Sequence, residues 1–105
     1  MSFSVRLTRA AEADLHRLFD FLLERELARD DGDLSLPEQA IAMLQAGFET
    51  LKITPFSCRK AGQSPFLREL IVPFGRSGYV ALFEIEDAAH VTVLAVRHQR
   101  EDDYH

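Results

Sequence analysis

Several polar residues in the C-terminal half of the chain belong to types that transfer protons or hold negative charge. They are Arg68, Tyr79, Arg97, His98 and Arg100. Imidazole titrates near neutral pH, and guanidinium groups bind anions through planar pairs of N–H donors. Tyr79 opens one strand-like segment and His98 ends the next, so antiparallel pairing of these segments would bring the two side chains together. The sequence therefore predicts a polar cluster on a C-terminal sheet.

The same residues also have structural interpretations. Arg68 could pair with Glu84 on a neighbouring strand, and Tyr79 could be a half-buried aromatic residue that closes the sheet. His98 could support the structure or contact a partner instead of acting as an acid. The sequence alone does not choose between the two interpretations.

Other kinds of site lack their sequence signatures. The histidines and the one cysteine are scattered, without the HExxH or CxxC spacing that would hold a metal ion. The segment from Gly75 to Gly78 has neither the glycine spacing nor the following helix of a phosphate-binding loop. No local pattern marks a catalytic triad. We therefore expect no metal ion and no cofactor.

Length and composition indicate one globular domain over residues 1–105. Apolar residues make up 47% of the chain and charged residues 28%, which is ordinary for a globular protein. A lone cysteine, Cys58, forms no internal disulfide, which fits a reducing cytoplasm. No apolar stretch approaches the roughly 18–20 residues of a membrane span. We expect a soluble cytoplasmic protein without a membrane partner.

The net charge of −5 has the wrong sign for binding nucleic acid by phosphate neutralisation, so no direct sequence-specific binding to nucleic acid is expected. The charge is unevenly distributed. Residues 1–51 hold 5 basic and 10 acidic side chains, residues 52–83 hold 5 and 1, and residues 84–105 hold 2 and 6. The middle segment is either ordinary surface variation or one electropositive patch that faces an acidic partner.

The N-terminal part reads as a strand and a long helix. Residues 3–7 alternate apolar and polar side chains, which is typical of a short strand. Thr8 is a suitable N-cap, and the apolar spacing predicts a helix from there to about Arg29. Some apolar residues fall outside the stripe that faces the core, which leaves room for a second contact: Phe21, Leu23 and Leu27.

The acidic run from Asp30 to Asp33 predicts a turn, and a second helix should follow to about Ile53. Ser35 and Glu38 have the spacing of a capping box, in which each side chain satisfies a free backbone N–H near the other. The two helices would form an antiparallel hairpin.

Residues 54–65 contain prolines and glycine without periodicity and read as a loop that carries Arg59 and Lys60. Three strands should follow, over residues 66–72, 78–86 and 90–98, joined as antiparallel hairpins. Alternation in the last strand would place Leu94 and Val96 on one face, and Val91, Val93 and Ala95 on the other. The fold class is α+β: a strand, a helical hairpin and a three-stranded antiparallel sheet, with the helices packed on one sheet face.

Both ends of the chain resemble one family. Residues 8–22 resemble the opening helix of ParE-type toxins of the RelE/ParE superfamily, and residues 96–102 resemble its closing His-x-Arg-x-x-Asp or His-x-Arg-x-Asp signature. Residues 51–55, residues 67–70 and the Gly78-Tyr79 pair follow in the family's order. The resemblance implies the toxin of a bacterial type II toxin–antitoxin module, which a small antitoxin neutralises.

The superfamily contains two mechanisms. RelE-like toxins cleave mRNA on the ribosome, which requires an acid or base and cationic groups, whereas ParE-like toxins poison DNA gyrase without that machinery. Val80 follows Gly78-Tyr79 where RelE-like chains usually have arginine, and Gln99 follows His98 where some nucleases have an aromatic residue. The gyrase branch is favoured, in which the protein is an inhibitor without catalytic residues.

Two alternatives stay open. A ribosome-dependent endoribonuclease would use Arg68, Arg97 and His98 as its catalytic residues. A degenerate member of the family would bind partners and leave cell growth unchanged.

Charge and apolar surface together predict how an antitoxin binds, as part of a toxin–antitoxin hetero-oligomer. Its C-terminal segment should fold on the apolar sheet surface, with acidic side chains that meet the basic middle segment. The predicted partner-binding residues are Arg59, Lys60, Arg68, Arg76, Tyr79, Leu94, Arg97, His98 and Arg100.

Overall fold

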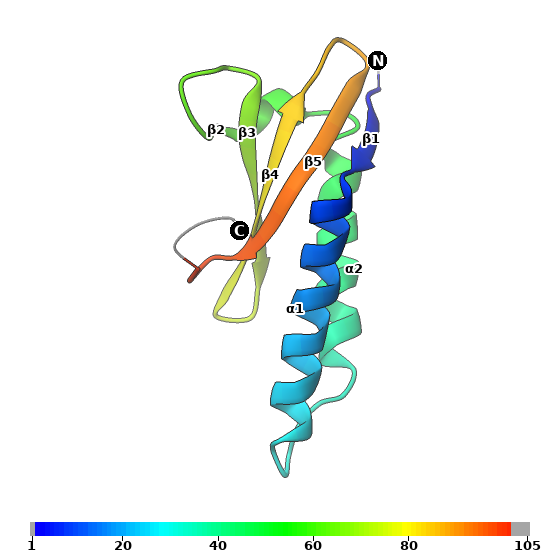
Figure 1. Ribbon diagram of the computed structural model, residues 1–105, viewed down its shortest axis with the longest axis vertical. Coiled ribbons are helices and arrows are strands. Elements are labelled where there is room, and N and C mark those ends of the chain that lie inside the picture. The colour runs from blue at the N-terminus through cyan, green and yellow to red at the C-terminus, as the bar shows by residue number, and fades with distance from the viewer. Residues whose placement is uncertain (1, 102–105) are drawn as a thin grey trace.

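A computed structural model describes residues 2–101, and it has the expected α+β class (Figure 1). The five strands form one sheet in the order β1-β5-β4-β3-β2, in which β1 runs parallel to β5 and the other neighbours are antiparallel. The elements are β1 (Ser4–Leu7), α1 (Arg9–Leu27), α2 (Leu36–Thr50), a 3-10 turn (Pro55–Ser57), β2 (Arg59–Lys60), β3 (Leu67–Phe74), β4 (Ser77–Ile85) and β5 (His90–His98).

The long helix α1 starts where the sequence predicts. Thr8 has an extended backbone, and its hydroxyl oxygen accepts a hydrogen bond from the Ala11 N–H at 3.1 Å. The helix ends at Leu27, two residues before the predicted end. This bond confirms Thr8 as the N-cap, since its hydroxyl satisfies one of the free N–H groups of the first helical turn.

The predicted capping box of α2 is wrong. Ser35 has helical backbone angles, and its hydroxyl makes no capping bond. The hydroxyl instead donates to Asp33 Oδ1 at 2.6 Å and accepts from Gln39 Nε2 at 2.8 Å. The Asp33 carboxylate also accepts the Ser35 backbone N–H, so an aspartate turn organises this helix start instead.

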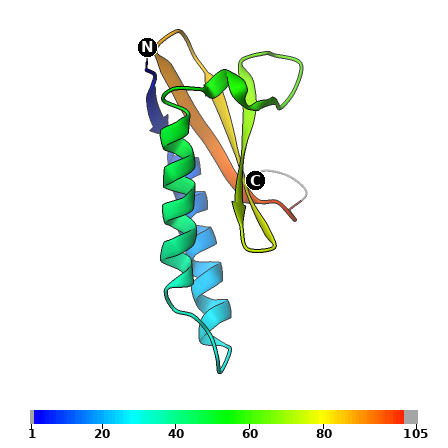
Figure 2. The same cartoon turned by 180° about the vertical axis from the view of Figure 1, so that it is seen from behind.

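Both helices pack on the same face of the sheet, as expected (Figure 2). Phe83 and Leu44 are fully buried in the core between them. At Gly47 the missing side chain lets α2 approach β3, because an added Cβ would lie 3.0 Å from the side chains of Leu70 and Val72. The helical hairpin extends well beyond the sheet at its turn, which leaves part of the inner helix surface without a strand above it (Figure 1).

The expected alternation in β5 is wrong at its centre. Between Leu82 and Phe83 of β4 the register shifts, so that Leu82 faces Ala95 and Phe83 faces Val93, which leaves Leu94 as the extra residue of a bulge. Val96 therefore joins Val91 and Val93 in the helix-facing core, with no solvent exposure for any of the three. These three valines therefore lie on the same, buried face of the sheet, and none of them is exposed to solvent.

Beyond the end of β1, side chains of helix α1 bond to the free backbone groups on the edge of β5. β1 pairs with β5 as far as Val93, and beyond it Asp14 Oδ2 accepts the Val96 N–H at 2.8 Å while Arg17 Nη2 donates to the Val96 carbonyl at 3.4 Å. Side chains of the helix thus replace a strand partner on this edge. They also fix the height at which α1 crosses the end of β5.

The predicted loop over residues 54–65 contains two short elements. Residues 55–57 form the 3-10 turn, and Arg59–Lys60 pair with Arg68 and Glu69 as the edge strand β2. Two residues are too short to show periodicity in the sequence.

Candidate functional site

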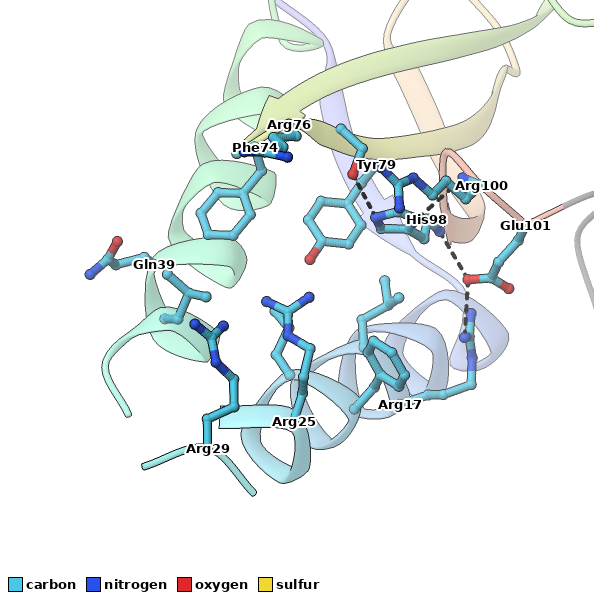
Figure 3. Close-up of a pocket in the computed structure, with 16 residues that line it drawn as sticks. Arg17, Arg25, Arg29, Gln39, Phe74, Arg76, Tyr79, His98, Arg100 and Glu101 are labelled. Carbon is cyan, nitrogen blue, oxygen red and sulfur yellow. Dashed lines mark hydrogen bonds and ion pairs between the residues drawn. The ribbon is translucent and has the colours of Figure 1, made fainter. Parts of the chain in front are cut away.

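A pocket of about 850 Å³ lies between the inner face of the helical hairpin, the β3–β4 turn and the segment after β5. In Figure 3, Phe74 and Tyr79 from the sheet point across this space toward Arg25 of α1 and toward Arg29, which follows the helix. Its lining includes Arg17, Leu18, Phe21, Leu22, Arg25, Arg29, Leu36, Gln39, Phe74, Arg76, Ser77, Tyr79, His98, Arg100 and Glu101. We call it the arginine pocket.

The β3–β4 turn positions the residues that line the arginine pocket on its sheet side. Gly75 has a φ of +61°, and no non-glycine residue in the described chain has a positive φ, so this two-residue turn has the pattern of type II′. Gly78 is pressed against the partner strand, where a Cβ would overlap the Val72 carbonyl oxygen. The tight turn holds Arg76, Ser77 and Tyr79 at the pocket rim.

His98 and Tyr79 face each other in register, which confirms the predicted approach. Their ring centroids lie 5.6 Å apart in an edge-to-face arrangement. Tyr79 is 2% exposed, and burial raises the pKa of its phenol. The phenol therefore stays protonated at neutral pH and is a poor proton acceptor.

Both ring nitrogens of His98 are engaged. Nδ1 accepts the Arg100 backbone N–H at 3.1 Å, so in the neutral ring the proton lies on Nε2, which is 2.8 Å from Ser77 Oγ. Burial and the nearby charges of Arg100 and Arg25 lower the pKa of His98, against an opposite effect of Glu101. His98 is therefore neutral at pH 7, and it donates from Nε2.

The segment that carries His98 is attached to α1. Glu101 Oε1 accepts both the His98 N–H at 3.0 Å and Arg17 Nη1 at 3.2 Å. Arg17 also lies 3.8 Å from Asp14. This network connects the helix, the end of β5 and the pocket.

Five arginines surround the pocket: two come from α1 and a third, Arg29, from the segment just after it. Arg17 and Arg25 stand at i and i+8, on the same face of the helix, and Arg29 keeps this four-residue spacing just past the helix end. Sequence reasoning missed this row because it counted α1 within an acidic segment. The missing signal was the helical spacing of the arginines.

The arginines differ in how they are paired. Arg25 and Arg29 contact the buried carboxylate of Glu26. The pKa of Glu26 is lowered most by the hydrogen bond from the Asp33 backbone N–H, and to a smaller extent by these two arginines. Among residues 2–101, no carboxylate pairs with Arg76 or Arg100. These last two cations are therefore available to a ligand.

The alternative catalytic residues do not lie together. Arg97 is on the sheet face opposite His98, where Nη1 donates to the Glu101 carbonyl at 2.9 Å and Nη2 lies 4.0 Å from Glu69. Arg68 lies toward the other end of β3. Its guanidinium donates to the carbonyls of Phe56, Cys58 and Pro65 at 2.7–3.1 Å, and it does not pair with Glu84.

The basic middle segment does not form one compact patch, and antitoxin docking on its residues stays a prediction. Arg59 pairs with Glu69 at 3.0 Å beside β2, whereas Arg76 lies in the turn at the opposite end of β3. An eight-residue strand separates these ends by about 25 Å. Lys60 is exposed beside Arg59, and Leu94 is half-buried in the bulge.

Among residues 2–101, no three His, Cys, Asp or Glu side chains gather closely enough to hold a metal ion. No helix in the same range has the length and apolar character needed to cross a membrane.

The two layers, a helical hairpin and a five-stranded sheet in this order, form a fold that is similar to those of solved toxin–antitoxin structures. The chain superposes with a TM-score of 0.68 on a structure of the chromosomal ParDE system from P. aeruginosa, with 18% identity over 91% of this chain and 95% of that one. It superposes with a TM-score of 0.60 on the toxin–antitoxin complex RelBE2 from Mycobacterium tuberculosis, with 21% identity over 96% and 95% of the two chains. These likenesses concern the fold.

Sequence comparison identifies the family. The model of the ParE toxin of the type II toxin–antitoxin system parDE matches residues 5–103. The chain is also 31% identical over 93 residues to Toxin RelE1 of Caulobacter vibrioides, which covers 88% of this chain and 90% of that protein. The protein belongs to the ParE toxin family of type II toxin–antitoxin systems.

Proposed function

We propose that this toxin inhibits DNA gyrase in the cytoplasm and is neutralised by a cognate antitoxin. The observation that supports the gyrase target best is the state of His98. Neither ring nitrogen is free to accept a proton, and the lowered pKa keeps the imidazole neutral, so the group is a poor general acid at pH 7. Arg68 and Arg97 both donate to backbone carbonyls, and Arg97 reaches the carbonyl of His98 rather than its ring.

The antitoxin is proposed by analogy with the ParDE and RelBE2 systems to which the fold is similar. A short gene beside the toxin gene, encoding a DNA-binding motif and an amphipathic tail, is the expected partner. Co-expression should restore the growth that the toxin alone arrests.

A supercoiling assay with purified gyrase tests the target. We expect micromolar toxin to inhibit supercoiling and to accumulate cleaved DNA complexes. A His98→Gln variant should inhibit equally, because glutamine keeps a donor toward Ser77 while removing the titratable group. Absence of inhibition by a toxin that arrests growth would contradict the proposal.

One observation favours the second candidate, a ribosome-dependent endoribonuclease. Five guanidinium groups around one pocket are suited to phosphate oxygens. Primer extension on translating mRNA would then show new 5′ ends with the native toxin and none with His98→Gln. This outcome, together with unaffected gyrase, would replace the gyrase proposal.

A further inference from the structure

The arginine pocket has the size and wall composition of a small-molecule site. Its volume of about 850 Å³ falls within the roughly 300–1,000 Å³ of ligand pockets. Apolar side chains form part of the wall, including Phe21, Leu36 and Phe74, and Gln39 adds an amide. Such a wall accepts a flat ring, and the amide can bond to the polar edge of that ring.

The charge of the lining is opposite to that of the protein. Among residues 2–101 the lining holds five arginines and one carboxylate, Glu101, whereas the whole chain carries −5. Arg17, Arg25 and Arg29 are also paired with carboxylates outside the lining. The arginines come from α1 and the segment just after it, from the β3–β4 turn and from the segment after β5, so they converge on a volume rather than follow a line. Convergent guanidinium groups fit a compact ligand with several negative charges, and phosphate groups match their planar pairs of donors.

The surroundings disfavour an extended polyanion. The turn beside Arg29 carries Asp30, Asp31 and Asp33, and Asp31 lies 3.6 Å from the Arg29 guanidinium. A nucleic acid strand or a long acidic peptide leaving the pocket in this direction would meet these carboxylates. The repulsion would oppose a long anion but not one that ends inside the pocket.

From these observations we propose that the arginine pocket binds a nucleotide with two or more phosphates. Arg76 and Arg100 hold the phosphates, together with Arg25, and the base lies against Phe21 and Phe74. The site is independent of the gyrase proposal, because it needs neither a target nor an antitoxin.

Isothermal titration calorimetry of the purified full chain tests the proposal, with ATP, GTP, inorganic tripolyphosphate and adenosine as probes at about 0.1 M salt. The variant Arg76→Gln/Arg100→Gln should weaken ATP binding by about 10-fold or more. The matched control, Arg9→Gln/Lys60→Gln, removes two exposed cations outside the pocket and should bind ATP as the native chain does. Phe21→Ser should weaken ATP but not tripolyphosphate, because Phe21 is 60% exposed and contacts only the base.

Four results would overturn the proposal. The first is no heat of binding with millimolar ATP or GTP. The second is an equal loss of affinity in both double variants, which would mean that only net charge matters. The third is tighter binding of a single-stranded oligonucleotide or a polyglutamate peptide than of ATP, which would assign the pocket to a macromolecule. The fourth is equal affinity for tripolyphosphate and ATP, which would mean that the base takes no part in binding.

Discussion

The two ends of β3 both carry arginines, yet they use them differently. At the β2 end, Arg68 donates to three carbonyls and stacks 5.2 Å from the Phe56 ring centroid, and Arg59 pairs with Glu69. At the turn end, Arg76 joins Arg100 at the arginine pocket without a carboxylate partner among residues 2–101. The first end uses cations to hold a loop together, and the second presents them to solvent.

This difference shows why a local excess of positive charge is a weak guide to a binding surface. The basic segment of the sequence supplies the structural arginines, whereas most of the pocket's arginines come from the acidic segments. What distinguishes a binding cation from a structural one is whether its donors are already occupied.

The largest effect is expected at the turn end, from Gly78→Ala. The added Cβ would overlap the Val72 carbonyl oxygen and lie 3.0 Å from the Phe74 nitrogen, which are backbone atoms that move only with the strand. We expect a loss of about 3 kcal/mol in the free energy of unfolding, measured by urea denaturation. Gly62→Ala is the control, since apart from its chain neighbours no atom of residues 2–101 lies within 4 Å of the added Cβ. Equal stability of the two variants would show that the strands can move to accommodate the added Cβ and would contradict this prediction.

A smaller effect is expected at the β2 end, from Arg68→Ala. The change leaves three carbonyls without their charged donor and removes the contact with Phe56, so unfolding should become easier by about 2 kcal/mol. Arg76→Gln, which has no such bonds, should change stability by less than about 0.5 kcal/mol. If both variants lose the same stability, the division between structural and available arginines is wrong.

The smallest effect concerns pH and His98. Its pKa lies below the ordinary value of 6.5 in the folded chain, so the unfolded chain binds more protons as the pH falls below 6.5. The contribution of His98 to stability should therefore decrease from pH 6.5 downward, until the folded pKa is passed. NMR titration of the ring should give a midpoint below 6.5, and Arg100→Gln should raise it. An unchanged midpoint in Arg100→Gln would exclude that charge as a cause.

Much of the fold was readable from local patterns. Thr8 as an N-cap, the helical hairpin and the last strand over residues 90–98 follow from spacing alone, because caps and periodicity act within a few residues. The approach of Tyr79 and His98 also followed, since a short connection forces antiparallel pairing. The resemblance of both chain ends to ParE-type toxins identified the family that the comparisons confirm.

Only the tertiary structure decided the rest, and each case depends on partners distant in the sequence. The bulge at Leu94, which brings Val96 into the core, is a mismatch between two strands and leaves no pattern in either one. Arg68 and Arg76 read alike in the sequence, and their roles separate because one reaches loop carbonyls and the other does not. The arginine pocket exists because α1 crosses β5 at the height set by Asp14 and Arg17, a contact that spans about eighty residues.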